Sequence, residues 1–461
     1  MSRVLDSARA GWRRLRRPVL LRRRRQAGIA LVVVTVTLAV LGAVVGDFSF
    51  NARVDLEAAA NARDTLRAEY LARSGMQLSR LLIKVQQAVL DKNRQFVGDI
   101  QIADFAPYLM KAFGGESDER AGLGALLGLD VSQMKGLGVG KNATFDVNMT
   151  SDDGRINVNC GGGINPNQPA AQSLYGVLSA LFWPPRYDNP PWRIWGSLDA
   201  DGQLAVRDET ARAIIDWTDV DEQQFAPQIT LPGATTPTPA SGSGGPESYN
   251  YDAGRDPYKA RNNFFDTLEE VNLVRGVGDN FWGTFGELLT VYGGCQVNIG
   301  AVPPEKWMIM AAIIRYSAKD PNNQALLDDV QVAAVAQKIL GLMQMTGGAL
   351  VKDVDTLIKF INDPEGAMKS LISGGSSSSS SSSSTTGILG IQLDPARAKS
   401  VMMMGPRRIY HLDSVGTIQR TREKKIQVHI RGIWDAEHFN QNTNSPDPND
   451  QRGTWVYWRQ D

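Results

Sequence analysis

The sequence predicts an α+β fold in which one very long N-terminal helix precedes an antiparallel sheet and a large, inserted all-helical domain. Three observations support this prediction. A charge-free apolar segment at 29–46 continues into residues with helical spacing, segments near the end of the chain alternate apolar and polar residues, and helical periods dominate from 172 to 289. Apolar residues that recur every three to four positions indicate an amphipathic helix, whereas alternation indicates a strand with one buried face.

The composition is that of an ordinary globular protein with a basic head. The 461 residues are 42% hydrophobic and 21% charged, which excludes wholesale disorder, a collagen-like fibre and a polytopic membrane protein. Basic and acidic residues balance at 49 each, yet the first 28 residues hold ten arginines and a single acid, Asp6. The rest of the chain therefore has 39 basic and 48 acidic residues, a net charge of −9 that argues against nucleic acid as its ligand.

The basic head and the apolar segment together predict a single membrane anchor. A helix over 29–46 spans roughly 27 Å, which is close to the hydrocarbon thickness of a bilayer. The preceding arginines place the N-terminus in the cytoplasm, so the remainder faces outward. Helical spacing continues past the apolar segment, and we expect one helix over 29–95. A conventional secretory signal peptide is the alternative, although no small-x-small cleavage site closes the apolar segment.

Pattern and composition divide the rest of the chain into three regions. Region 96–160 contains an expected β-hairpin, with strands at 145–149 and 155–159 around a turn at 151–154. Region 161–290 is the inserted helical domain, and region 291–461 combines expected helices at 307–316 and 328–343 with a β-meander of segments 408–412, 418–420, 425–434 and 454–459. A Pro- and Ser-rich segment at 231–246 and a serine-rich loop at 373–387 are too poor in apolar residues to join the core.

The N-terminus resembles the type IV pilin and pseudopilin class. A basic leader ends in Gly28 and precedes Ile29 and the long apolar-to-amphipathic helix. The resemblance implies that prepilin peptidase removes residues 1–28 and that Ile29 becomes an N-methylated terminus. Most members of the class have Glu at the fifth mature position, where this chain has Val33. A missing Glu is typical of the largest minor pseudopilin of type II secretion, the general secretion pathway protein K family.

Four further motifs resemble the same family. They are G-x-I-N-x-N at 154–159, D-W-x-D-x-D at 216–221, R-N-x-x-F at 261–265 and a Tyr-Trp-Arg end strand at 457–459. The resemblance implies a non-enzymatic subunit of the bacterial inner membrane with its C-terminal domain in the periplasm. It would initiate or cap the pseudopilus, together with minor pseudopilins I and J, also H, and the major pseudopilin G.

Two other functions remain open. The first is a minor pilin of a related type IV pilus or DNA-uptake system, which the acidic net charge disfavours. The second is an anchored periplasmic enzyme, but the sequence offers no recognisable catalytic constellation.

An acidic stretch is the candidate metal site. Asp216, Asp219, Asp221 and Glu222 follow one another closely at the expected end of a helix. Calcium takes six to eight oxygen ligands from carboxylates and carbonyls on irregular loops, which such a stretch can supply. A solvated acidic helix end is the alternative reading. The family resemblance implies a structural calcium ion in the inserted helical domain.

The two cysteines are candidates for one disulfide. Cys160 closes the first Asn-x-Asn segment, and Cys295 stands just before a similar segment at 297–299. Matching places on strands that could be neighbours, in an oxidising periplasm, point to a bond. A pair of buried free thiols is the alternative.

Overall fold

The computed structural model describes residues 27–93, 101–103, 106, 142–162, 169–199, 202–227, 246–247, 251, 257–346, 351–364, 388–420, 424–436, 439–440, 445–446 and 453–461. The expected leader up to residue 26 and the serine-rich loop at 373–387 lie outside the described residues. So do residues 231–245 and most of 96–141.

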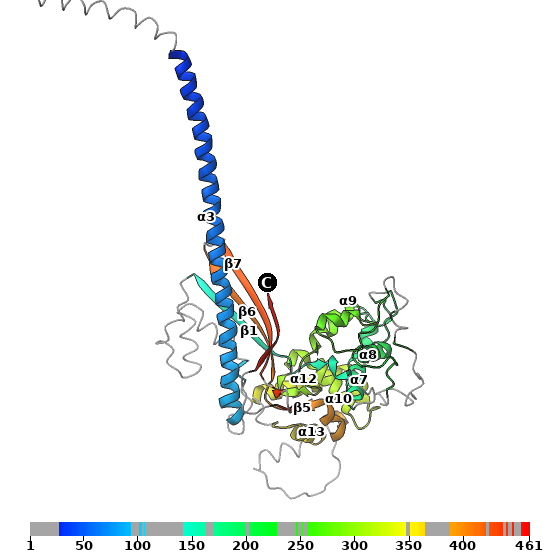
Figure 1. The fold of residues 1–461 in the computed structure, drawn as a ribbon. Coiled ribbons are helices and arrows are strands. Elements are labelled where there is room, and N and C mark those ends of the chain that lie inside the picture. Colours follow the sequence, from blue (N-terminus) through cyan, green and yellow to red (C-terminus); the bar gives the residue numbers. More distant parts are fainter. Residues whose placement is uncertain are drawn as a thin grey trace, which may run out of the picture.

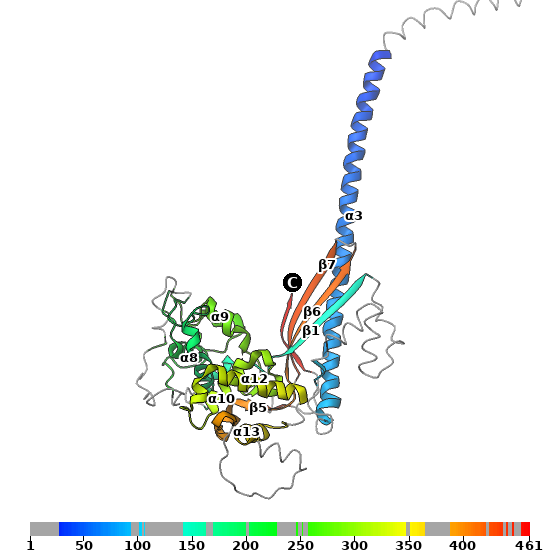
Figure 2. The same ribbon diagram turned by 180° about the vertical axis from the view of Figure 1, so that it is seen from behind.

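One helix dominates the N-terminal part of the structure. Helix α3 (Ala27–Val85) has 59 residues and passes into the short π-helix η1 (Gln86–Leu90) and the 3-10 helix η2 (Asp91–Asn93). At 1.5 Å per residue α3 is roughly 90 Å long. Its N-terminal half projects away from everything else, and its C-terminal half lies along a sheet (Figures 1 and 2). The continuous helix expected from the spacing of apolar residues is confirmed.

The sheet has four strands in the order β1-β6-β7-β10, all antiparallel. The strands are β1 (Ala143–Ser151), β6 (Ile409–Gln419), β7 (Lys425–Asp435) and β10 (Thr454–Gln460), and a separate two-residue pair joins β8 (Phe439–Asn440) to β9 (Ser445–Pro446). The expected C-terminal meander is present, although segments 408–412 and 418–420 belong to one continuous strand, β6. Alternate residues of β1 and β6 are buried, as the period of two requires.

Small residues allow α3 to lie directly on this sheet. Ala68, Ala72 and Met76 of α3 are completely buried. A Cβ atom added to Gly416 of β6 would lie 1.9 Å from the Ala68 carbonyl oxygen, so no side chain fits there. The Ser414 hydroxyl, also on β6, donates a 2.8 Å hydrogen bond to the Ala72 carbonyl oxygen. Helix and sheet are therefore matched in shape and in polar contacts.

The remaining elements form a helical body beside the lower end of α3 (Figure 1). Its helices are α7 (Pro169–Phe182), α8 (Arg207–Asp216), α9 (Asp279–Phe285), α10 (Trp307–Ser317), α11 (Gln324–Leu327), α12 (Asp329–Thr346), α13 (Val354–Asn362) and α15 (Pro395–Val401). The 3-10 helices are η4 (Val158–Gly161), η5 (Pro185–Asp188), η7 (Leu268–Leu273), η8 (Gly286–Leu288), η9 (Ile299–Ala301), η10 (Pro304–Lys306) and η11 (Ile388–Gly390). Two-residue parallel pairs join β2 (Ile156–Asn157) to β3 (Leu289–Thr290) and β4 (Val297–Asn298) to β5 (Met402–Met403).

The expected boundary of the helical domain at residue 290 is wrong. One hydrophobic core runs from Ile156 to Met402. Within it, the Tyr316 ring of α10 covers Gly176 of α7, where an added Cβ would come within 2.3 Å of the ring. Nearly every residue of α10 is buried, so this apolar helix has to lie inside the body and cannot belong to a separate C-terminal region.

The expected hairpin between β1 and residues 155–159 is also wrong. β1 pairs with β6, whereas β2 pairs in parallel with β3 inside the body. The turn after β1 explains the difference. The Asp153 carboxylate accepts hydrogen bonds from the backbone N–H groups of Arg408 (2.5 Å) and Ile409 (2.9 Å), which directs β6 and not β2 alongside β1.

Candidate functional site

Residues 29–46, in the N-terminal half of α3, expose an apolar surface without a charged side chain. Ile29 is 68% exposed and Val33 is 58% exposed, like their apolar neighbours along the segment. Within the described residues, α3 is the one helix long and apolar enough to cross a membrane, a test that a signal sequence near the N-terminus also passes. A surface of this kind in water is unfavourable, so the segment needs lipid or other apolar helices around it. Gly28, the expected cleavage position, lies in the first turn of the helix.

The polar groups of this apolar segment bond within the helix. The Thr35 hydroxyl donates to the carbonyl oxygens of Leu31 and Val32, and the Thr37 hydroxyl donates to those of Val33 and Val34. A membrane contains no water to satisfy a free hydroxyl, so such bonds allow threonine to enter the hydrocarbon region.

The G-x-I-N-x-N motif holds the body together. The Asn157 side chain donates to the Gly293 carbonyl oxygen at 2.9 Å, and its oxygen accepts the Asn159 N–H at 3.0 Å. The Asn159 side chain links the segment of Gly293 to one further segment, because it donates to the carbonyl oxygens of Val291 and Phe265 and accepts the Phe265 N–H. The two asparagines therefore have a structural role, because their side chains satisfy backbone groups of three chain segments at once.

Cys160 and Cys295 form a disulfide in the structure. Their Cα atoms are 5.5 Å apart, and the bond joins positions 135 residues apart in the sequence. Cys160 lies in η4, directly after the β2 strand, and Cys295 precedes β4. The bond thus fastens the start of the body to the segment that leads into α10.

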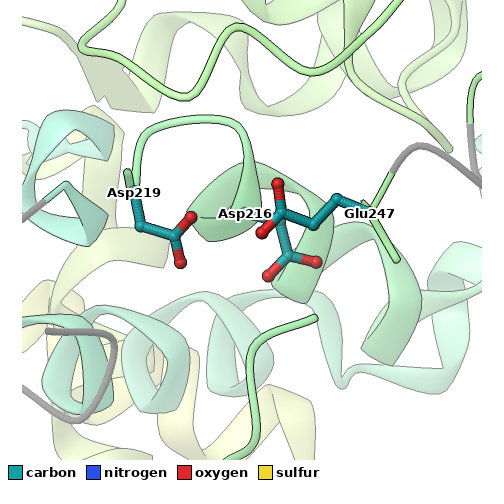
Figure 3. A group of neighbouring side chains, drawn as sticks. All are labelled: Asp216, Asp219 and Glu247. Carbon is teal, nitrogen blue, oxygen red and sulfur yellow. The ribbon is translucent and has the colours of Figure 1, made fainter. Parts of the chain in front are cut away.

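Three carboxylates meet at the end of α8 (Figure 3). Asp216 is the last residue of α8, Asp219 lies in the turn that follows, and Glu247 comes from a separate segment. One ligand oxygen from each carboxylate lies within 4.8 Å of the others. The Glu247 N–H donates to the Glu222 carbonyl oxygen at 3.2 Å, and this contact fixes Glu247 opposite the turn.

The three acids are buried, and burial is the main reason why the pKa of each is raised. Their exposed fractions are 2%, 0% and 2% for Asp216, Asp219 and Glu247. Burial raises the pKa of Asp216 to about 7, of Asp219 to about 8 and of Glu247 to about 10, and the repulsion of neighbouring carboxylates adds to the shift. Without a cation, the site therefore holds protons at neutral pH.

The pattern of hydrogen bonds fits a bound cation. Asp216 accepts the Phe225 N–H at 2.6 Å, but all four side-chain oxygens of Asp219 and Glu247 are buried without a donor. Buried acceptors left without partners are unfavourable, and a shared proton or a metal ion would relieve them. Three convergent carboxylates supply hard oxygen ligands, which is the donor type that calcium prefers.

Only part of the predicted metal site is brought together. Asp216 and Asp219 belong to the cluster of three carboxylates, whereas Glu222 is exposed and contributes its backbone carbonyl to the position of Glu247. Asp221 lies nearby and raises the pKa of all three acids, and its own carboxylate accepts the N–H of Gln223. Glu247 was not predicted. It follows the Pro- and Ser-rich segment and shares no spacing pattern with the others, so no local signal marks it.

Comparison with known proteins gives a likeness to a solved structure but no match of sequence. No protein-family model matches the sequence, and none of the curated proteins matches it. The chain is similar to a chain in the crystal structure of the GspK-GspI-GspJ complex from the enterotoxigenic Escherichia coli Type 2 Secretion System. The identity is 13%, the TM-score is 0.43, and the match covers 86% of this chain and 99% of that chain.

Proposed function

We propose that this chain is a minor pseudopilin of type II secretion of the protein K type. It is anchored by residues 29–46 in the bacterial inner membrane, with the sheet and helical body in the periplasm. Its role is to assemble a fibre and not to catalyse a reaction. Prepilin peptidase acts between Gly28 and Ile29, and the new N-terminus becomes methylated.

The observation that carries the proposal is the two-part surface of α3. The C-terminal half of this helix is fixed on the sheet, so the exposed N-terminal half is held out as a rigid apolar rod. A subunit of this form buries its rod against sister helices when it leaves the bilayer. The pseudopilin motifs at Gly28 and at 154–159 agree with this use of the helix.

Val33 favours a place at the tip of the fibre. A carboxylate inside an apolar bundle is costly unless it meets a positive charge, and a subunit that docks beneath another one would use its Glu to meet that neighbour's terminal amine. Val33 offers no such group, so this chain has nothing to place beneath another amine. The bulk of the helical body beside the sheet also opposes addition of a further subunit above it. Minor pseudopilins I and J are its proposed first neighbours, with H and the major pseudopilin G below.

The test is to co-express the full chain with pseudopilins I, J and G and to crosslink the purified pseudopili. We expect one copy of this chain for each fibre, crosslinked to I and J. A Val33→Glu variant should enter at additional positions, whereas Val33→Leu is the matched control and should remain at the tip. Wild-type chain throughout the shaft, at a stoichiometry like that of G, would contradict the tip role.

We further propose that the cluster of Asp216, Asp219 and Glu247 binds a structural calcium ion. The support is the set of four buried carboxylate oxygens without donors, together with the hard-ligand chemistry of the cluster. Bound calcium would fix the segment carrying Glu247 to the end of α8. Thermal unfolding with and without calcium tests this proposal.

The alternative of a pilin for DNA uptake is distinguished by a binding measurement. The acidic net charge of the chain after residue 28 disfavours phosphate contacts. Salt-dependent DNA binding by the full chain at physiological ionic strength would favour that alternative.

A further inference from the structure

The helical body and the sheet with α3, here called the sheet unit, have separate hydrophobic cores. Among the described residues, one cluster of buried apolar side chains joins α3 to the sheet, and the other fills the body. A cavity of about 270 Å³ at the seam is lined by Met149 of the sheet unit and by Leu340 and Met343 of the body. Two units are expected to move relative to each other unless a large apolar interface joins them. Their arrangement therefore depends on the polar contacts at the seam.

In the described part of the chain, the backbone passes between the two units at two neighbouring places. The first crossing, 151–155, leads from β1 into β2, and the second crossing, 404–408, leads from β5 into β6. The Asp152 N–H donates to the Ile409 carbonyl oxygen at 3.0 Å, so the two crossings meet where the sheet ends. Figures 1 and 2 show the body beside this lower end of the sheet. A joint of a few loop residues is the usual form of a hinge between domains.

Asp153 of the first crossing bonds to both units. Its carboxylate accepts the N–H groups of Arg408 (2.5 Å) and Ile409 (2.9 Å), where β6 starts. Its backbone carbonyl oxygen accepts the N–H of Asn298 in the body at 2.8 Å. The Asn298 side chain continues the link, because it donates to the Gly405 carbonyl oxygen of the second crossing at 2.9 Å. A carboxylate is a strong acceptor of such bonds, so this aspartate fastens the sheet unit to the body.

Gly154 allows the body to come close to the first crossing. A Cβ atom added to this glycine would lie 2.5 Å from the Ala301 carbonyl oxygen and 2.9 Å from the Val302 nitrogen. The same segment of the body is held from the second crossing, because the Arg407 side chain donates to the Gly300 carbonyl oxygen at 3.2 Å. Backbone atoms cannot turn aside as the end of a side chain can. Any larger residue at position 154 would therefore push the body away from the sheet unit.

We propose that segments 151–155 and 404–408 form a hinge between two rigid units, and that Asp153 and Gly154 lock this hinge at one angle. The Asp153 carboxylate ties the hinge to β6, and the close approach at Gly154 seats the hinge on the body. The cavity at the seam leaves room for the body to tilt once these contacts are lost, because both units contribute to its walls. The inference does not depend on the secretion function.

Double electron–electron resonance of the full chain in detergent micelles tests the proposal. Nitroxide labels at Lys338→Cys of α12 and Gln427→Cys of β7 report the distance between the units. Lys338→Cys with Lys259→Cys reports a distance within the body, and Gln427→Cys with Ser74→Cys reports one within the sheet unit. All four positions are exposed, and the two native cysteines are bonded to each other, so the labels attach to the introduced cysteines. We expect a single narrow distribution between the units.

Asp153→Ala should broaden this distribution, and Gly154→Ala should shift its mean, whereas the distances within each unit should not change. Asp146→Ala is the matched control, because it removes an exposed aspartate of β1 outside the hinge and should change none of the three distances. Asp153→Asn keeps the shape without the charge and replaces Asp153→Ala if circular dichroism shows that the alanine variant is unfolded.

Three results would overturn the proposal. The first is a broad distribution between the units before either substitution, which would show that no lock exists. The second is a folded variant of Asp153 or Gly154 that gives the same distribution between the units as the control. The third is a folded variant that changes a distance within one unit, because the sheet unit and the body would then not move as rigid units.

Discussion

The cluster of Asp216, Asp219 and Glu247 predicts that bound calcium stabilises the folded chain, whereas a rise in pH without calcium destabilises it. Folding raises the pKa of Asp216, Asp219 and Glu247 above the ordinary values of about 4. Between that value and the folded values the native state binds more protons than the unfolded state, so stability without calcium falls as the pH rises. One pKa unit corresponds to about 1.4 kcal/mol, and ionising the cluster near pH 8 therefore costs a few kcal/mol when no cation is bound.

Calcium should remove this cost, because it binds the ionised carboxylates. Free calcium at about 100 times its dissociation constant adds about 2.7 kcal/mol by mass action. A domain of roughly 150–250 residues gains about 2–4 °C for each kcal/mol, so we expect the midpoint of thermal unfolding to rise by roughly 5–10 °C. The calcium-induced rise should be larger at pH 8 than at pH 6, because fewer protons then compete for the oxygens.

The assay is circular dichroism of the full chain in detergent micelles, heated with EGTA or with calcium at pH 6, 7 and 8. Glu247→Gln keeps the shape of the side chain but cannot ionise. It should raise the midpoint in EGTA at pH 8 and abolish the response to calcium. Glu222→Gln is the matched control, because Glu222 is exposed and lies outside the cluster. The reasoning fails if both variants respond to calcium like the wild type, or if the midpoint in EGTA does not depend on pH.

Three further predictions concern other parts of the chain. Gly416→Val should destabilise the contact between α3 and the sheet by about 3 kcal/mol or more, because the added Cβ would overlap the Ala68 carbonyl oxygen. Gly294→Ala is the neutral control in the same unfolding assay, because a Cβ at that position meets open space. Replacing both cysteines with serine should cost about 2–5 kcal/mol, since the disulfide closes a loop of 135 residues, and a midpoint equal to that of the oxidised wild type would disprove the expected contribution. Gly28→Leu should leave the leader attached, and N-terminal sequencing of wild-type protein should start at Ile29; a start near Asp47 would indicate a conventional signal peptide.

The elements that the sequence predicts well are those with a strong local period. The long helix α3 and the strands β7 and β10 follow directly from apolar spacing, because each period matches one backbone geometry, whereas β6 was predicted only as two shorter segments. Helices α10 and α12 also begin and end within a few residues of their predicted limits. The α+β class follows from these elements together and is confirmed by the structure.

Features that depend on distant partners were predicted less well. The partner of β1 is set by hydrogen bonds that the Asp153 carboxylate accepts from the N–H groups of Arg408 and Ile409, which are 255 and 256 positions away, and no local pattern encodes such bonds. The same reason applies to Glu247, which reaches the cluster only because the body folds its segment back onto the end of α8. Segment 268–274 has helical spacing but forms the 3-10 helix η7, which ends before Val274. The spacing of apolar residues therefore locates the helices and strands, whereas tertiary contacts decide which strands pair and which residues form the carboxylate cluster.

The Asp153 contacts also have a consequence for how the chain folds. The helical body is an insertion between two strands that lie side by side, since Asp153 and Ile409 are hydrogen-bonded although they are 256 residues apart. Pairing β1 with β6 in an unfolded chain would require closing a very long loop. The entropy of that loop is lost before the stabilising contacts form, and topologies of this kind fold slowly. If the body forms first, its two ends are already close and the remaining loop is short. The sheet, and with it the docking of α3, is then the last part to form. The edges of β1 and β6 would therefore stay unpaired until the inserted helical body has folded.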